Sequence, residues 1–327
     1  MKIAILHSPD ALEPPVDPVL DHVESALRAS QHDVERIPAD PDVGALVAAL
    51  ERAKPEFIFN LAESYAGKSA MDSNVAALLN MLGHRYTGSS PAGLFLAGDK
   101  TLSKKVLQFH GIKTPEFVTM YRGALEWAGD IDFPVIVKPP QEDASIGISS
   151  SSAVRDLKEL FGRIGALQAE YQSPVLVEQF VDGREFYVGV LGNAKAEALP
   201  VIELDFSRFP KDRPQIASWE AKWGDDGEGS GAEYDGTESI FPEKLDEELE
   251  QRMKDVAVEA FNALRLRDYA RIDLRVSEGG EIYVIEVNPN CYLERDSEFA
   301  RAARKSGIEY DTLVSRIVDL AMARYDR

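Results

Sequence analysis

Short apolar stretches alternate with amphipathic ones along the first part of the chain, and this alternation limits the folds open to it. The strand-like stretches are 2–6, 32–39 and 55–62, and apolar residues recur at helical spacing over 17–30 and 43–53. Strands that alternate with helices form parallel sheets covered by helices on both faces. We therefore expect a parallel α/β domain that ends at the turn-rich connection near residue 88.

The remainder of the chain has strand-like stretches that follow one another closely. We expect 184–192 to pair with 197–205, and 269–277 to pair with 281–290 around a short turn. The segment 218–239 is rich in glycine and has little apolar periodicity. It is therefore predicted to be a long loop, of the kind that is usually functional or disordered.

Three oxygen-bearing side chains are predicted to meet on the last strand pair. Asp273 lies in the middle of one strand. Glu286 and Asn288 lie two positions apart on the other strand, so the side chains of these two residues share a face. Carboxylate and amide oxygens suit a hard cation such as Mg²⁺. The alternative is that Asp273 pairs with Arg271 or Arg275 and that Asn288 begins a turn, and spacing alone leaves both interpretations open.

Two lysines suggest contacts with phosphate. Lys138 ends an apolar strand and Lys100 begins a helix, and a lysine in an apolar setting needs an anionic partner. Ser145 and Gly147 follow Lys138 in a stretch of small residues whose backbone N–H groups could face phosphate. An ordinary surface loop is the alternative for this stretch.

The apolar side chains of the segment "VLVEQFV" could pack against a purine ring. Backbone groups at Gln179 and Val181 could bind the edge of such a ring, and Glu185 could bind ribose hydroxyls. A plain core strand is the alternative.

Composition excludes several classes of partner. The chain has 36 Lys+Arg and 56 Asp+Glu, a formal charge of −20, which disfavours a nucleic-acid backbone or an anionic membrane surface. The single cysteine, Cys291, allows no internal disulfide, and packing explains it better than reactivity. No stretch is long and apolar enough to span a membrane and the first residues have no signal-peptide pattern, so we expect a cytoplasmic protein.

Several motifs occur in a fixed order from Tyr86 to Asn290, and together they are specific: "YTGSS", "GDKTLSKKVL", "FPVIVKP", "SIG", "VLVEQFVDGREFYVGVLG", "EAKW", "ARIDLRV" and "YVIEVNPN". With them the chain resembles the ATP-grasp superfamily, and most closely the D-alanine–D-alanine ligase family. The resemblance implies a three-domain α/β (α+β) fold with nucleotide bound between two α+β domains. It implies bounds of 1–88 for the N-terminal domain, 89–177 for the central ATP-grasp subdomain and 178–327 for the C-terminal one.

The resemblance also implies roles for individual residues. Catalytic roles fall to Arg271, which would stabilise the transition state of the acyl phosphate, and to Lys222, which would reach the γ-phosphate. The implied contacts with ATP are made by Lys100, Lys138, Ser145, Glu178, Gln179, Val181, Glu185 and Lys222. The implied ligands of Mg²⁺, or of Mn²⁺ in its place, are Asp273, Glu286 and Asn288.

The substrate half departs from the family pattern. The Gly-rich turn with a glutamate after the first strand is replaced by "HSPDALEPP", in which Glu13 is a loose candidate, and the histidine-glycine pair after the third strand by "NLAESYAG". "PNCYLERDSEF" stands where the family has Ser-Pro-Gly-Met after the metal asparagine, Trp223 replaces a tyrosine and Ala144 replaces a serine.

The resemblance therefore implies an ADP-forming carboxylate–amine ligase whose small-molecule acid and amine differ from D-alanine. A genuine D-alanine–D-alanine ligase and an ATP-binding module without catalysis are the alternatives. The sequence leaves the oligomeric state open, a homodimer included.

Overall fold

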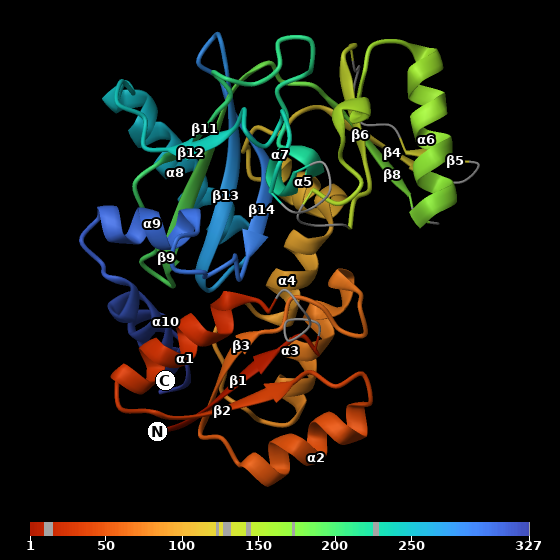
Figure 1. Ribbon diagram of the computed structural model, residues 1–327. Helices are drawn as coiled ribbons and strands as arrows, with labels where there is room; N and C mark the ends of the chain where they lie inside the picture. Colours follow the sequence, from red (N-terminus) through yellow and green to blue (C-terminus); the bar gives the residue numbers. More distant parts are fainter. Residues whose placement is uncertain are drawn as a thin grey trace.

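The computed structural model describes residues 1–9, 16–121, 124–126, 132–141, 145–171, 174–224 and 229–326. Its strands form three sheets (Figure 1). In the view of Figure 1 the first sheet lies at the bottom, the second at the upper right, and the third at the upper centre. This mixture of one parallel and two antiparallel sheets confirms the predicted α/β (α+β) class.

The first sheet is parallel and has the order β2-β1-β3. Its strands are β1 (Lys2–His7), β2 (Asp33–Pro38) and β3 (Phe57–Leu61). Neighbouring side chains of β1 point to opposite faces, so Ala4 and Leu6 pack with α2 (Val43–Ala53), α3 (Asp72–Met81) and α4 (Pro91–Gly98). Ile3 and Ile5 pack on the other face with α1 (Pro18–Ala29) and with α10 (Tyr310–Tyr325), the last helix of the chain.

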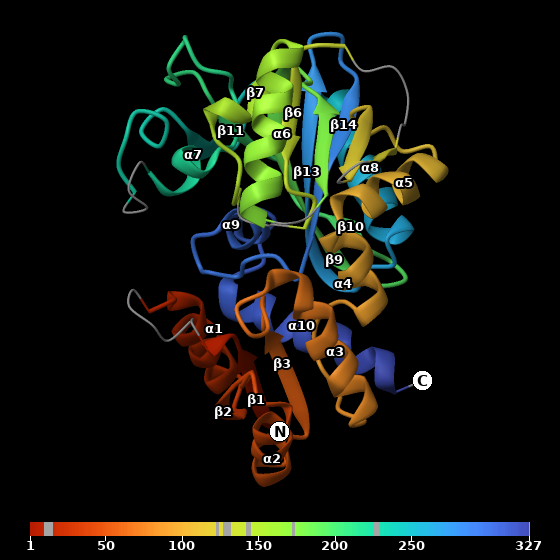
Figure 2. The same ribbon diagram turned by 90° about the vertical axis from the view of Figure 1, so that its right-hand side faces the viewer.

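The second sheet is antiparallel and has the order β5-β4-β8-β6-β7. Its strands are β4 (Phe117–Tyr121), β5 (Ala124–Glu126), β6 (Val135–Lys138), β7 (Ala153–Val154) and β8 (Val175–Gln179). The helix α6 (Leu157–Tyr171) covers one face, where Ile164 and Leu167 pack on the valines of β6 and β8 (Figure 2). The other face is thereby left for the pocket described below.

The third sheet is also antiparallel, with the order β12-β11-β9-β13-β14 and β10 paired to β9. Its strands are β9 (Gly183–Gly192), β10 (Glu197–Ala198), β11 (Ile202–Asp205), β12 (Glu238–Ile240), β13 (Asp268–Ser277) and β14 (Ile282–Pro289). The strand pairs β9–β11 and β13–β14 confirm the two antiparallel pairings expected from the sequence.

Further helices pack around the third sheet. The helix α8 (Glu247–Ala263) packs Met253, Ala257 and Phe261 against the apolar face of the third sheet, and α5 (Lys100–Phe109) lies beside α8. The helix α9 (Glu298–Lys305) contributes Phe299 to the core that it shares with α10. The predicted loop 218–239 differs from the structure at its start, because Ser218 caps the short helix α7 (Trp219–Trp223), and 225–228 lie outside the described residues.

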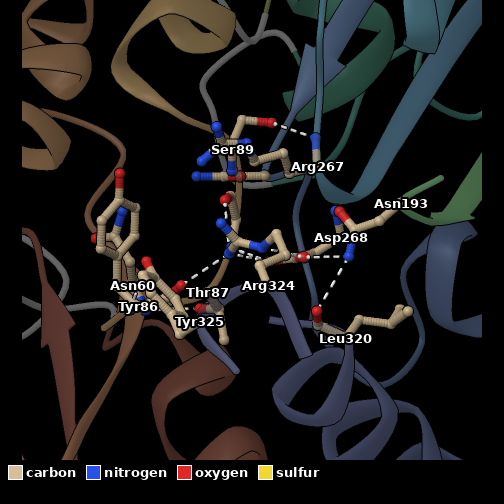
Figure 3. A network of polar contacts seen from close by, with 12 residues as sticks. Asn60, Tyr86, Thr87, Ser89, Asn193, Arg267, Asp268, Leu320, Arg324 and Tyr325 are labelled. Carbon is tan, nitrogen blue, oxygen red and sulfur yellow. Dashed lines mark hydrogen bonds and ion pairs between the residues drawn. The ribbon is translucent and has the colours of Figure 1, made fainter. Parts of the chain in front are cut away.

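A buried polar network ties the end of α10 to the connection that follows the first sheet (Figure 3). The carboxylate of Asp268 is fully buried and accepts hydrogen bonds from Gly88 N at 2.7 Å, Asn193 Nδ2 at 3.0 Å and Arg324 Nη2 at 2.8 Å. Arg324 Nη2 also donates to Tyr86 O at 2.9 Å. Since a buried charge is costly without partners, these contacts explain why both ions are kept at this position.

Candidate active site

A pocket opens between the second and the third sheet, at the ends of β6 and β8 and beside the middle of β14. Its wall is apolar in part, from Ile136, Phe180, Ile216 and Ile285. Most of the predicted site residues line it as well, namely Lys138, Ser145, Glu178, Gln179, Val181, Glu185, Lys222, Asp273 and Glu286. Residues from five strands, two loops and α7 therefore meet in one place, although more than 140 positions separate the first of them from the last.

The remaining predicted residues lie next to this pocket. Lys100 Nζ is 2.7 Å from Glu286 Oε1, and Arg271 Nε is 2.8 Å from Asp273 Oδ1. Asn288 follows Glu286 on the same face of β14. Lys100 and Arg271 are thus each one contact from a pocket residue, and Asn288 is two positions from one along β14.

Glu178 is almost fully buried in the wall of the pocket and lies between two ammonium groups. Lys138 Nζ is 2.5 Å from its Oε1, and Lys104 Nζ is 3.0 Å from its Oε2. Burial raises the pKa of Glu178, but the two lysines outweigh this and lower it below its usual range. Lys104 is not among the residues expected from the sequence, although its position one turn after Lys100 on the same helix face is a usable signal.

Glu185 also has a cationic partner. Arg275 Nη2 donates to Glu185 Oε2 at 2.9 Å, and Tyr187 donates its hydroxyl to Oε1 at 3.1 Å. Arg275 therefore pairs with Glu185, and the alternative that it pairs with Asp273 is wrong. The contact crosses from β9 to β13, where Glu185 lies directly opposite Arg275.

The predicted metal ligands are neighbours across the pair β13–β14. Asp273 is directly opposite Glu286, and Arg271 is directly opposite Asn288. The pairing shifts by one residue between Asp273 and Leu274, so Ile285 is an extra residue on β14, as in a β-bulge. The bulge turns Glu286 and Asn288 to the pocket face, whereas Val284 on its other side packs toward α8.

Cationic side chains surround the two carboxylates of this group. The guanidinium of Arg271 donates to both oxygens of Asp273, at 2.8 and 2.9 Å, so the pairing considered as the alternative to a metal site is present. Burial raises the pKa of Asp273 in spite of this partner. Burial also acts to raise the pKa of Glu286, but Lys100, Lys222 and Lys138 lower it to about 2.

Asn288 lies inside β14, so the alternative that it begins a turn is wrong. Its buried Nδ2 atom has no hydrogen-bond partner among the described residues. An amide whose nitrogen is not held by the protein can turn its oxygen to a cation at little cost. Two carboxylates and this amide therefore fit Mg²⁺, which needs few protein oxygens.

Arg271 connects the pocket to the first turn of α9. Its Nη1 atom is 3.7 Å from Glu298 Oε2, and its guanidinium lies 4.7 Å from the centre of the Tyr187 ring. Burial acts to lower the pKa of Arg271, but Asp273 and Glu298 raise it well above its usual range. The arginine is therefore a permanent cation whose position is fixed by two carboxylates.

The loops above the pocket are bound to each other. Ser145 Oγ donates to Ala217 O at 2.6 Å, and Trp219 N donates to Ile148 O at 2.8 Å. These bonds hold α7, and with it Lys222, over the pocket. Ser145 thus contacts the opposite loop through its hydroxyl, a contact that the sequence could not show.

The segment after Asn288, where the family pattern fails, is fixed to both ends of the chain. Tyr292 donates its hydroxyl to Asp17 Oδ1 at 2.7 Å, and Glu294 Oε1 is 3.2 Å from His22 Nδ1, both at α1. Tyr310 of α10 donates to Leu293 O at 2.7 Å. Cys291 is buried and its pKa is raised by burial, which fits the packing interpretation, whereas Glu13 and Ala144 lie outside the described residues.

The comparisons with known proteins agree with this architecture. A family model described as "D-ala D-ala ligase C-terminus" matches residues 105–319. An uncharacterized protein, y4sG, of Sinorhizobium fredii is 34% identical over 94% of this chain and 88% of its own length. A D-alanine–D-alanine ligase of Pelotomaculum thermopropionicum is 31% identical over 92% of this chain and 90% of its own.

Solved structures show the same fold. The D-alanine–D-alanine ligase of Bacillus anthracis complexed with ATP superimposes with a TM-score of 0.74 at 22% identity, over 99% of this chain and 98% of that one. A second structure of the D-alanine–D-alanine ligase of Bacillus anthracis superimposes with a TM-score of 0.75 at 23% identity, over 99% of this chain and 98% of that one.

One α/β unit followed by two antiparallel sheets that enclose a pocket of lysines and carboxylates defines the ATP-grasp class, and the protein is an ATP-dependent ligase. The chain belongs to the D-alanine–D-alanine ligase family. The expected family and fold are thereby confirmed. Among the described residues no helix is long and apolar enough to cross a membrane. The division at 88 and 177 stays a prediction.

Proposed function

We propose that the pocket binds ATP with Mg²⁺ and that the protein joins a carboxylate to an amine other than a pair of D-alanines. In the proposed reaction the carboxylate attacks the γ-phosphate, and an acyl phosphate forms as ADP leaves. The amine then attacks the acyl carbon and phosphate departs. This chemistry depends mainly on positioning and on neutralisation of charge, which the pocket residues supply.

Each part of the pocket has a role in this proposal. The apolar wall and the backbone at Gln179 and Val181 would bind the purine, and Glu185 the ribose. Lys100, Lys138 and Lys222 would contact phosphates, and the backbone at Ser145 would support them. Lys100 and Lys138 now pair with Glu286 and Glu178, so a phosphate would share or replace these carboxylates as their partner.

Asp273, Glu286 and Asn288 would hold the Mg²⁺, which neutralises phosphate charge when it is bound. Arg271 would turn from Asp273 to the developing negative charge of the transition state, with Glu298 keeping it in place. The loop with α7 would keep water from the acyl phosphate.

The segment from Asn290 to Ser297 is the observation that carries the proposed change of substrate. Bulky and charged side chains occupy it, and Tyr292 and Glu294 bind α1 rather than facing an open site. A site built on hydrogen bonds rejects a substrate that cannot make them by about 10⁴-fold or more. The second candidate, a genuine D-alanine–D-alanine ligase, is favoured by the names of relatives such as the Pelotomaculum enzyme.

Release of phosphate from ATP and Mg²⁺ in the presence of paired amino acids tests the proposal. We expect D-alanine at millimolar concentration to give little product and another acid and amine to drive ADP formation. Asp273→Asn serves as the inactive control. Fast, saturable synthesis of D-alanyl-D-alanine would instead establish the second candidate.

The setting of the activity is also a proposal. We place the reaction in the cytoplasm, where ATP is available. A homodimer is compatible with the proposal, and sedimentation of the purified protein distinguishes it from a monomer.

A further inference from the structure

Helix α5 carries two buried lysines that point toward the pocket from behind. Lys100 and Lys104 are one helical turn apart, and they are 3% and 1% exposed. Lys100 reaches Glu286 on β14, whereas Lys104 reaches Glu178 on β8. One helix face is therefore bound to both sheets that enclose the pocket.

Lys104 also contacts the bulge in β14. Its Nζ atom donates to Ile285 O at 3.3 Å, and Ile285 is the extra residue that has no partner in the pairing of β13 with β14. Lys104 thus donates to the backbone carbonyl next to Glu286 and forms an ion pair with the carboxylate of Glu178. The described residues that line the pocket include Glu178 and Ile285 but not Lys104, so Lys104 stands behind the pocket wall.

Two lysines pair with the single negative charge of Glu178. Lys138 lies 2.5 Å away on the pocket side and Lys104 lies 3.0 Å away on the far side, so two ammonium groups share one carboxylate. If Lys138 turns to a phosphate, Glu178 keeps a counter-ion only because Lys104 is there. A buried carboxylate without a counter-ion would be strongly disfavoured.

We propose that Lys104 is a positioning residue that holds Glu178 and the bulge at Ile285 in place, and so frees Lys138 to bind an anionic group of the nucleotide. The inference rests on the proposed ATP site. A role in packing alone would not need the charge, since an apolar side chain of similar length fills such a position without the cost of burying an ammonium group.

The test is a double-mutant cycle on nucleotide affinity, read by calorimetric titration of Mg·ATP, together with kcat and KM for ATP. Lys104→Met removes the charge and keeps the length, and Lys104→Gln is the second variant should the first not fold. The matched control is Lys105→Met, because Lys105 is the next residue and is exposed.

We expect Lys104→Met to weaken Mg·ATP binding and raise KM by about tenfold or more, the effect of one lost charge-assisted contact. We expect kcat to change much less and Lys105→Met to match the wild type. In a Glu178→Gln background the same Lys104 substitution should have a much smaller effect, because the charge that it neutralises is gone.

Unchanged affinity in the Lys104 variants would overturn the inference, and so would an equal loss in both backgrounds. Failure of the wild type to bind Mg·ATP would overturn the proposed function and this inference with it. Normal binding by the wild type with an additive cycle would remove the role of Lys104 alone.

Discussion

Gly88 lies where the first sheet connects to the rest of the chain, and its replacement by alanine is a sharp test of the packing there. Its φ is +91°, a backbone conformation that costs an ordinary residue roughly 1–2 kcal/mol. A Cβ atom at this position would overlap Oδ1 of Asn290 and lie 2.7 Å from its Cγ. The amide cannot turn away freely, because Asn290 Oδ1 accepts a hydrogen bond from Ser89 N at 2.8 Å.

The backbone strain and the overlap with Asn290 together set the loss of stability expected for Gly88→Ala. Overpacking or the loss of the Asn290 hydrogen bond adds about 1–3 kcal/mol to the backbone strain, for a total of about 3 kcal/mol. The entropy of unfolding is about 2 cal/mol/K per residue, or about 0.7 kcal/mol/K for 327 residues. If the chain unfolds in one step, Tm should fall by about 4 °C.

Gly83→Ala is the matched control. Gly83 also has a positive φ, +74°, but a Cβ atom there would meet nothing within 4 Å. Gly83→Ala should therefore add only the backbone strain, which lowers Tm by about 2 °C. Calorimetric scans that give the same shift for both variants would refute the argument from Asn290, and Asn290→Ala should reduce the added cost of Gly88→Ala.

Three other predictions concern the pocket. Glu286→Gln should fold normally but lower turnover by about a thousandfold, because a metal carboxylate contributes several kcal/mol to transition-state stabilisation; full activity at saturating Mg²⁺ would exclude Glu286 as a ligand. Lys138→Ala should weaken ATP binding in a calorimetric titration, and unchanged affinity would remove it from the phosphate site. Burial lowers the pKa of Lys104 to about 8, in spite of Glu178, from an ordinary value of 10.5. Between pH 8 and pH 10.5 Lys104 is protonated in the unfolded chain but mostly neutral in the folded one, so it makes the free energy of unfolding rise with pH. Denaturation of Lys104→Met over this pH range should lack that rise.

The sequence could predict the elements that depend on local patterns. The strand alternation of the first sheet, and the two-residue spacing that brings Glu286 and Asn288 to one face, are both present. The bulge at Ile285 could not be foreseen, because nothing in "YVIEVNPN" distinguishes it from a regular strand. Yet without the bulge the two side chains would share the face of Ile282 and Val284, which belongs to the apolar core.

Contacts between distant segments could not be predicted from the sequence either. Arg275 and Glu185 are opposite each other only because β9 pairs with β13 in one particular register. Lys104 could have been noticed from its spacing to Lys100, but its partner Glu178 is on another sheet. Residue type and spacing indicate which groups belong to a site, whereas their pairing depends on tertiary structure.

The position of α10 has a consequence for how the protein is made. The first sheet is synthesised before α10, but the face that carries Ile3 and Ile5 is covered by α10, and Arg324 binds Tyr86 and Asp268. A domain at the start of a chain ordinarily folds during synthesis. Here a nascent chain that stops before Tyr310 leaves that apolar face partly bare, so the core on this face of the first sheet is completed only when α10 has been translated.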